Sequence, residues 1–207
     1  MHTRPVNSGL LLAFDGLDGC GKTTQLARFA LRLRAAGHDV LETHEPTEGV
    51  WGRRIRAMAR SGERVPADEE LRWFVEDRAE HVEREIAPAL AAGRTVLTDR
   101  YTLSTVAYQG ARGLDWRELL ADAEARFPLP DLVLLFEIEP AAGMARIRAR
   151  GEPLEPSFEE TGFLTRVAQV FAALPCSYIE RIAGAGSVDR VEARVRAALE
   201  RRLPDLF

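Results

Sequence analysis

One stretch near the N-terminus restricts this chain to a small set of folds: residues 10–28 read LLLAFDGLDGCGKTTQLAR. The stretch opens with an unbroken apolar run, Leu10–Phe14, as expected for a central strand that is covered on both faces. Gly16–Thr23 then fits the phosphate-loop pattern G-x-x-x-x-G-K-[ST] at every fixed position. Apolar residues at helical spacing follow directly. A strand, a glycine-rich turn and a helix in this order predict a binding site for a nucleoside triphosphate.

The residue types in this loop suit a bound anion. Its glycines let the backbone curl so that successive N–H groups point at phosphate oxygens. Lys22 adds a positive charge near the outer phosphates, and the Thr23 hydroxyl is a ligand for Mg²⁺. The positive end of the following helix faces the same spot. We therefore expect the triphosphate to be bound by Gly16, Asp18, Gly19, Cys20, Gly21, Lys22, Thr23 and Thr24.

Composition limits the remaining classes of function. The chain has 207 residues, of which 46% are hydrophobic and 29% charged, which suits one globular domain over residues 1–207. A net charge of −4 provides no basic field for nucleic acid. No apolar run is long enough to span a membrane. Cys20 and Cys176 lack disulfide or metal-ligand spacing, so we expect a cytoplasmic protein.

Cys20 has two interpretations. Its place at the start of a helix favours a thiolate, which would make the loop sensitive to alkylation and protected by the bound nucleotide. A small packed side chain explains the residue equally well.

Strand and helix patterns alternate along the whole chain. Expected strands lie at 10–14, 40–43, 95–98, 132–138 and 178–182, and expected helices include 50–60, 68–86, 104–109, 116–127, 141–150, 163–174 and 189–202. This alternation predicts an α/β fold of the P-loop NTPase type, with a parallel five-stranded sheet and helices on both faces. Asp99 and Arg100 follow the third strand and therefore belong at the same sheet edge as the phosphate loop.

Two groups of arginines suggest phosphoryl transfer. Arg78 falls on the apolar stripe of the 68–86 helix, where it needs an anion or hydrogen-bond acceptors unless its stem merely covers the core. Arg146, Arg148 and Arg150 precede Gly151-Glu152-Pro153, an arrangement typical of a lid that brings arginines to transferring phosphates, although a solvated helix face is the alternative. No guanine-recognition N-K-x-D is evident, which disfavours a GTPase.

Several further segments resemble one family, thymidylate kinase. Residues 99–110, DRYTLSTVAYQG, are similar to the family signature D-R-[YHF]-x-x-S-x-x-A-Y-Q-G. Phe74–Arg78 resembles the family's F-x-x-x-R, and Thr43–Pro46 resembles its T-R-E-P. Residues 148–152, RARGE, resemble the lid of the bacterial subtype whose catalytic arginine comes from the lid, and Gly19 agrees with that subtype.

This resemblance implies a reaction and a set of roles. The γ-phosphoryl of ATP, held with Mg²⁺, is transferred to thymidine monophosphate. The implied catalytic residues are Lys22, Asp99, Arg100 and Arg150, with Thr23 and Asp99 at the metal. The implied acceptor site is Asp18, Glu45, Phe74, Arg78, Arg100, Thr105, Tyr108 and Gln109; Phe74 stacks on the base, Arg78 hydrogen-bonds it, Tyr108 packs under the sugar, and Arg100 grips the phosphate. A lid over residues 146–160 and a homodimer are also implied.

The chain departs from the family pattern in places. His44 replaces the arginine of T-R-E-P, and Leu154–Glu159 differs from the usual lid sequence L-D-R-[FI]-E. These changes keep two alternatives open: a nucleotide-binding relative without turnover, and another nucleotide or deoxynucleoside kinase.

The lid generates a first prediction. We expect Arg150→Ala to lower kcat by about 10²–10⁵-fold with little change in either Michaelis constant, because an arginine that meets the spreading charge acts mainly in the transition state. Arg150→Lys should rescue little, since an ammonium cannot make a forked contact. Single-turnover rates test this against Arg148→Ala. A near-normal rate for Arg150→Ala contradicts the assignment, and a collapse only in Arg148→Ala transfers the role to Arg148.

Overall fold

A single parallel sheet forms the middle layer of the computed structural model, which describes residues 9–149, 151 and 161–206. Its order is β2-β3-β1-β4-β5, and every neighbouring pair is parallel. The strands are β1 (Leu10–Gly16), β2 (Val40–His44), β3 (Thr95–Asp99), β4 (Leu132–Glu137) and β5 (Ile179–Ala183). The five predicted strands and the α/β fold class are confirmed.

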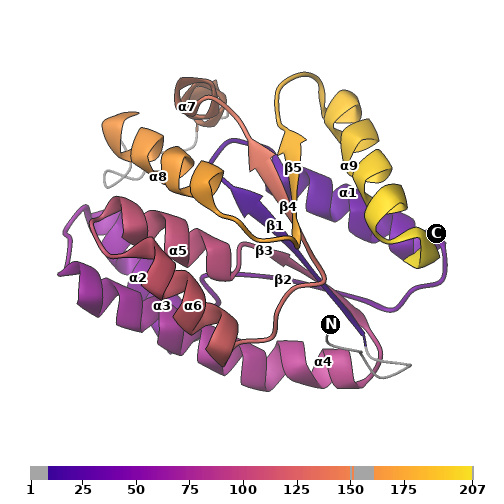
Figure 1. The fold of residues 1–207 in the computed structure, drawn as a ribbon, viewed down its shortest axis with the longest axis horizontal. Helices are drawn as coiled ribbons and strands as arrows, with labels where there is room; N and C mark the ends of the chain where they lie inside the picture. Colours follow the sequence, from indigo (N-terminus) through magenta and orange to yellow (C-terminus); the bar gives the residue numbers. More distant parts are fainter. Residues whose placement is uncertain (1–8, 150, 152–160, 207) are drawn as a thin grey trace.

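Helices cover both faces of the sheet (Figure 1). One face carries α1 (Lys22–Ala35) and α9 (Val188–Arg202), the latter followed by the short η3 (Pro204–Leu206). On the other face the chain places α2 (Val50–Ser61), α3 (Ala67–His81), η1 (Val82–Ile86), α4 (Ala87–Ala91), α5 (Thr102–Ala111), α6 (Trp116–Arg126) and α8 (Thr161–Ala173), with α7 (Pro140–Ala149) packed on α8.

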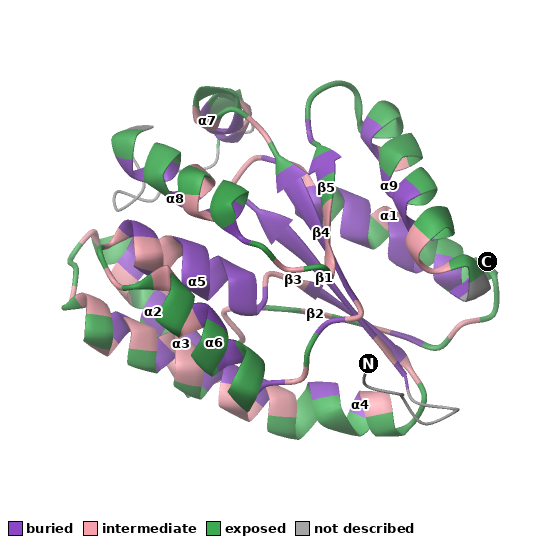
Figure 2. Ribbon diagram, viewed as in Figure 1, coloured by how far each residue is buried: buried purple, intermediate pink, exposed green. Residues whose placement is uncertain are grey.

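The apolar side chains of β1 pack into two separate hydrophobic clusters, one on each face of the sheet. Leu11 and Ala13 lie in the cluster beneath α5 and α8, whereas Leu12 and Phe14 lie in the cluster beneath α1 and α9. Successive strand residues point to opposite faces, so only a strand that is apolar at every position can fill both cores. Every residue of β1 after Leu10 is buried, and Figure 2 shows the central strands as mostly buried.

The long helix predicted for 68–86 is continuous but irregular. It runs as α3 to His81, passes through the π-helical turn η1, and continues as α4 to Ala91. Pro88 lies in α4 and has no N–H to bond the carbonyl of Arg84, which explains why regular α-helical bonding is interrupted here.

The apolar stripe predicted on this helix is only partly correct. Ile86 is buried, but Leu71, Phe74, Val75 and Val82 are half-buried, and the fully buried residues of α3 are Glu70, Trp73, Asp77, Arg78 and His81. The face of α3 that turns inward is therefore largely polar. Such a face needs partners for its charges, and the site described below supplies them.

Backbone hydrogen bonding between neighbouring segments continues beyond the carboxyl ends of β2 and β3. The Arg100 N–H donates to the Phe14 carbonyl at 2.9 Å, and the Glu45 N–H donates to the Asp99 carbonyl at 3.0 Å. Glu45, which follows β2, is thereby held against the end of β3, and Arg100, which follows β3, against β1, so both lie at the carboxyl edge of the sheet, as predicted for Asp99 and Arg100.

Two further expectations concern single segments. Asp115 caps α6, its side chain accepting a hydrogen bond from the Arg117 N–H at 2.9 Å, as the sequence predicts. Of the proposed lid, Arg150 and residues 152–160 lie outside the described residues. Within the described part of the chain, no helix has the length and apolar character needed to cross a membrane.

Candidate active site

The phosphate loop has the left-handed backbone that its glycines predict. Gly16, Gly19 and Gly21 have φ values of 135°, 76° and 97°. A Cβ on Gly19 would also lie 2.3 Å from the Gly143 carbonyl oxygen, so any side chain here would displace the backbone of α7. Lys22 begins α1 and is buried, so its ammonium is held within the loop.

Asp18 contacts three of the other predicted site residues. Its carboxylate accepts hydrogen bonds from Arg100 at 2.5 Å and from the Tyr108 hydroxyl at 3.2 Å, and lies 3.5 Å from the Lys22 ammonium. Burial alone would raise the pKa of Asp18, but attraction to Arg100 and Lys22 outweighs burial and holds that pKa well below its usual range. Burial and the neighbouring Asp18 raise the pKa of the Tyr108 hydroxyl. The site therefore holds Asp18 as a carboxylate and Tyr108 as a neutral phenol.

Arg100 adopts an uncommon backbone to reach this position. It is the one non-glycine residue with positive φ, 71°, in the described chain. Its guanidinium also donates to the Ser104 Oγ at 2.9 Å and to the Gly16 carbonyl at 3.3 Å. Residues held in the left-handed region cost free energy and gather at functional sites. This backbone turns the Arg100 side chain toward the phosphate loop.

The two residues predicted to hold Mg²⁺ are in contact: the Thr23 hydroxyl donates to the Asp99 carboxylate. Asp15, close by, is fully buried and accepts from the Ser104 N–H at 3.1 Å, the Ser104 hydroxyl at 2.5 Å and the Gly16 N–H at 2.9 Å. Burial raises the pKa of Asp15. Its contacts make Asp15 a support for the loop and for the start of α5.

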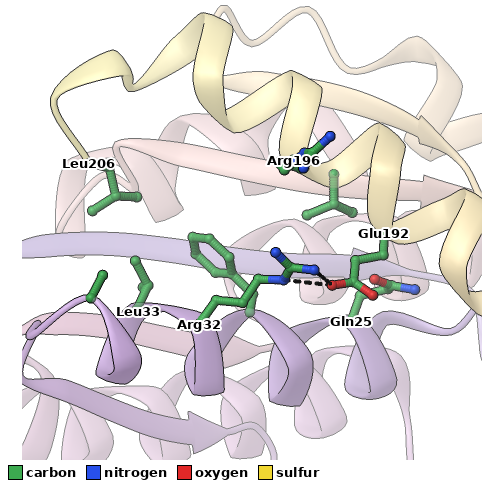
Figure 3. Close-up of a pocket in the computed structure, with 9 residues that line it drawn as sticks. Gln25, Arg32, Leu33, Glu192, Arg196 and Leu206 are labelled. Carbon is green, nitrogen blue, oxygen red and sulfur yellow. Dashed lines mark hydrogen bonds and ion pairs between the residues drawn. The ribbon is translucent and has the colours of Figure 1, made fainter.

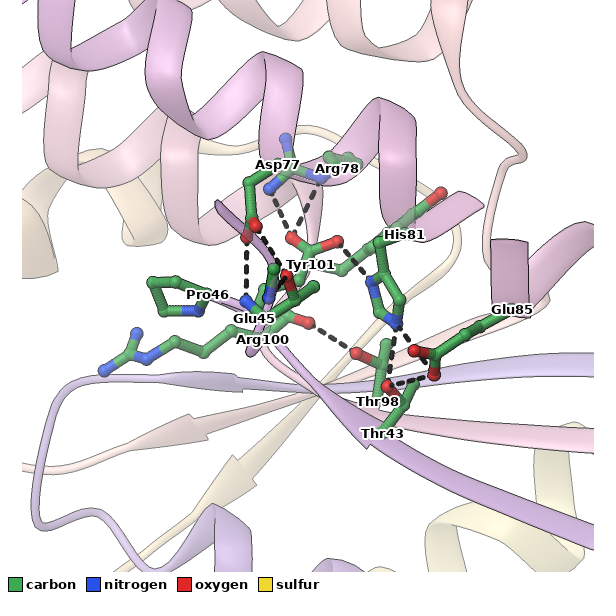
Figure 4. Close-up of polar contacts among 12 residues, drawn as sticks. Thr43, Glu45, Pro46, Asp77, Arg78, His81, Glu85, Thr98, Arg100 and Tyr101 are labelled. Atoms are coloured by element: carbon green, nitrogen blue, oxygen red, sulfur yellow. Dashed lines mark hydrogen bonds and ion pairs between the residues drawn. The ribbon is translucent and has the colours of Figure 1, made fainter. Parts of the chain in front are cut away.

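A buried polar network lies behind the phosphate loop (Figure 4). Arg78 donates to the Glu45 Oε2 through Nε at 3.0 Å and Nη2 at 2.6 Å, and Nη2 also donates to the Thr105 hydroxyl at 2.8 Å. The other Glu45 oxygen lies 3.0 Å from His81 Nδ1. Burial would raise the pKa of Glu45, but Arg78 and His81 together hold it below its usual value. Arg78 is therefore a buried, paired cation, and its apolar-stem interpretation is not needed.

A second polar pair lies two helical turns earlier on α3. The Gln109 Nε2 donates to the Glu70 Oε1 at 2.9 Å, and both side chains are buried. Thus α3 and α5 are joined by two rungs, Arg78–Thr105 and Glu70–Gln109. Phe74 falls midway between the rungs on α3, since residues four apart share a helix face. The contacts between α3 and α5 thus include the predicted acceptor-site residues Arg78, Thr105 and Gln109.

Sequence reasoning missed the residues that support this network. Asp77 accepts from the Thr47 N–H at 2.8 Å and hydroxyl at 2.6 Å, and His81 also contacts the Thr43 hydroxyl at 2.7 Å. Glu70 is held by Arg112 and, at 3.5 Å, by Arg64. The available signal was the spacing of Glu70, Asp77 and His81 on the helical face of Arg78, which marks a polar face.

The structure decides between alternatives at two residues. Arg146 does not lie on the solvated helix face that the sequence allowed: it is half-buried and donates to the carbonyls of Gly19 at 3.3 Å and Gly184 at 3.0 Å, so it anchors α7 to the phosphate loop. The Cys20 thiolate is not favoured: the side chain is 1% exposed, and burial raises the pKa of the thiol more than Lys22 lowers it. The packed interpretation of Cys20 is the correct one.

A separate pocket lies in the seam between α1 and α9 (Figure 3). Arg32 and Glu192 form an ion pair across it with a nitrogen–oxygen distance of 2.6 Å. None of the predicted site residues lines this pocket, whose lining is Gln25, Phe29, Arg32, Leu33, Ala36, Glu192, Val195, Arg196 and Leu206.

Comparison with known proteins agrees with the geometry. The family description "Thymidylate kinase" matches residues 14–195 of the chain. The chain belongs to the thymidylate kinase family. Its relatives include the thymidylate kinases of Akkermansia muciniphila, 41% identical over 96% of this chain and 95% of that protein, and of Xanthomonas euvesicatoria pv. vesicatoria, 44% identical over 95% and 86%. The thymidylate kinase of Desulfotalea psychrophila is 43% identical over 90% of this chain and 92% of its own length.

The packing of Cys20 generates a second prediction. We expect Cys20 to resist alkylation by iodoacetamide at pH 7, since a buried thiol with a raised pKa presents neither the thiolate nor access. Cys176, which is half-buried, serves as the internal control and should be labelled first. Peptide mass spectrometry of the native protein measures both rates. Rapid labelling of Cys20 that nucleotide suppresses would restore the reactive-thiol hypothesis.

Proposed function

We propose that the thymine of thymidine monophosphate binds beside Phe74, Arg78 and Gln109 of α3 and α5, and that the phosphate loop holds the ATP that phosphorylates it. As a thymidylate kinase, the chain is a phosphotransferase that converts thymidine monophosphate to the diphosphate with ATP. The proposal concerns which residues perform each part of this reaction.

One observation carries the assignment of the base site. The Gln109 Oε1 is buried and has no hydrogen-bond partner among the described residues, although its amide nitrogen is bonded to Glu70. An unpaired buried acceptor costs free energy unless a ligand supplies a donor. Thymine presents an N3–H donor between two carbonyl acceptors. Gln109 Oε1 therefore suits N3–H.

The neighbouring groups suit the rest of the thymine ring. Arg78 uses Nε and Nη2 for Glu45 and Thr105, which leaves Nη1 without a bond in the described part of the chain and able to donate to a thymine carbonyl. Phe74 lies between the two rungs and offers an aromatic face for stacking. Glu45 itself is enclosed by Arg78 and His81, so its role is to position Arg78.

The phosphate of the acceptor would lie near Arg100 and Asp18, with Tyr108 beside the sugar. The acceptor phosphate has a second pKa of about 6, so its oxygen is already a nucleophile at neutral pH and needs no general base. Catalysis then consists of positioning and neutralisation of charge by Lys22, Arg100 and a lid arginine, Arg150. Arg150 remains a proposal that rests on the sequence.

Thr23 and Asp99 fit a magnesium site. They offer one hydroxyl and one carboxylate that already touch, and Mg²⁺ commonly binds one or two protein oxygens together with substrate phosphates. The described residues contain no cluster of three or more His, Cys, Asp or Glu side chains suited to a metal, which agrees with a metal held mainly by the nucleotide. When bound, Mg²⁺ supplies neutralisation of charge on the β- and γ-phosphates.

The contacts of the buried carboxylates disfavour a deoxynucleoside kinase. Such an enzyme needs a general base for a 5′-hydroxyl. Glu45 has both oxygens bonded to Arg78 and His81, and Asp15 has both bonded to Ser104 and Gly16. Each of these oxygens already accepts a hydrogen bond within the protein, so both carboxylates are committed to holding protein groups in place.

Phe74 tests the base site. We expect Phe74→Ala to raise the Michaelis constant for thymidine monophosphate by about 5- to 150-fold, since stacking of a base on an aromatic ring contributes about 1–3 kcal/mol, and to leave the constant for ATP unchanged. Leu71→Ala, one turn away and also half-buried, is the matched control and should change neither constant. Normal saturation by the acceptor in Phe74→Ala would place the thymine elsewhere.

Two further features are proposed for the whole molecule. We propose a cytoplasmic homodimer, supported by the family resemblance and by two free cysteines, which suit a reducing compartment. Sedimentation velocity at micromolar concentration should give about twice the 23.0 kDa mass of the chain, and a single species at the mass of one chain would exclude the homodimer.

A further inference from the structure

The rung between Glu70 and Gln109 is the starting observation. Glu70 is 4% exposed, and its two oxygens have different partners. Oε2 is held by Arg112 and by Arg64, and Oε1 accepts the hydrogen bond from Gln109 Nε2. Arg112 also donates to the Val65 carbonyl at 2.7 Å, which fixes its guanidinium in turn. The carboxylate is therefore clamped with one oxygen directed at Gln109.

This arrangement removes a freedom that a glutamine side chain otherwise has. An amide can rotate by half a turn and exchange its donor and acceptor ends at little cost. A carboxylate beside two arginines is an acceptor only, so Gln109 must present Nε2 to Glu70. Rotation would break this hydrogen bond and place the amide oxygen against a carboxylate oxygen. Glu70 thus fixes Gln109 with its acceptor, Oε1, on the side away from Glu70.

We propose that Glu70 is a positioning residue that sets the base preference of this enzyme by fixing the orientation of the Gln109 amide. The inference rests on the proposed function, in which Gln109 Oε1 meets the base. With Oε1 presented, the site accepts a pyrimidine whose N3 carries a hydrogen, such as thymine or uracil. It rejects a pyrimidine whose unprotonated N3 is an acceptor, such as cytosine, because two acceptors would face each other.

The preference for one class of base is set by Glu70, which does not itself contact the base. Gln109 alone could accommodate either class of base by rotating its amide. The hydrogen bond to Glu70 makes one orientation far more stable, and hydrogen bonds to charged groups are the stronger kind. Glu70 need not touch the acceptor to have this effect, since it acts through Gln109.

The decisive variant is Glu70→Gln, which keeps the size of the side chain and replaces the carboxylate by an amide able to donate or accept. The measurement is kcat/KM for thymidine monophosphate divided by kcat/KM for 5-methyl-2′-deoxycytidine monophosphate. These acceptors share the methyl group, sugar and phosphate. The contribution of Arg78 to rejecting the amino group is present in both enzymes and cancels from the comparison.

We expect the selectivity ratio to fall by about 10- to 100-fold in Glu70→Gln, the range that corresponds to losing a hydrogen bond to a charged group. Both rates come from one preparation, so a smaller folded fraction does not alter the ratio. Should Glu70→Gln yield no folded enzyme, the double variant Glu70→Gln/Arg112→Gln removes both charges together and should give the same fall. A ratio within about threefold of the original overturns the proposal.

Two controls separate the explanations. Arg112→Gln removes the ion pair but leaves Glu70 to hold Gln109, so its ratio should stay within about threefold; a fall as large as that of Glu70→Gln would mean that the ion pair is responsible and would overturn the proposal. Gln109→Leu tests the underlying site. If it leaves acceptor saturation unchanged, the proposed base site fails; if it weakens saturation while Glu70→Gln keeps its selectivity, only the role of Glu70 fails.

Discussion

The ion pair between Arg78 and Glu45 is the interaction on which the site depends. Both side chains are almost fully buried, and a buried charge is tolerated only when its partners are complete. The guanidinium carbon lies 5.3 Å from the Tyr101 ring and 5.5 Å from the Phe127 ring, so aromatic faces cover what hydrogen bonds do not. Satisfying this one pair, with the Thr105 hydroxyl as a further acceptor, brings the end of β2, the last turn of α3 and the first half of α5 to one place.

The residues around this ion pair also have their buried polar groups paired. His81 holds the second oxygen of Glu45, and Asp77 binds the backbone and hydroxyl of Thr47 just beyond it (Figure 4). Asp77 and His81 both lie on the buried face of α3. The helix is therefore polar where a helix of an ordinary core would be apolar. Its packing energy comes from other surfaces, while this face is committed to holding Arg78.

Features set by local chemistry were predictable from the sequence. The phosphate loop follows from its glycines and from the fully apolar strand before it, and the parallel sheet follows from the alternation of patterns. Asp99 and Arg100 were placed correctly because parallel strands end at one edge. The partners of Arg78 were not predictable, since Glu45 is 33 residues away and its direction depends on how β2 meets α3. The sequence left two interpretations of Cys20 open, because the local effect of the helix end favours a thiolate and only the folded state shows that burial outweighs that effect.

The position of α5 has a consequence for the shape of an acceptor. Arg100 precedes this helix and Gln109 lies near its end, so on the proposed assignment one rigid segment reads both the phosphate and the base. The Arg100 guanidinium also folds back along this helix, donating to the Ser104 Oγ at 2.9 Å and to the Tyr108 hydroxyl at 3.5 Å, so its position relative to Gln109 is fixed by α5. The helix thus fixes the distance between the phosphate contact and the base contact. A nucleotide with a suitable base but a longer or shorter reach to its phosphate could satisfy one end only, and the enzyme would reject it by length alone.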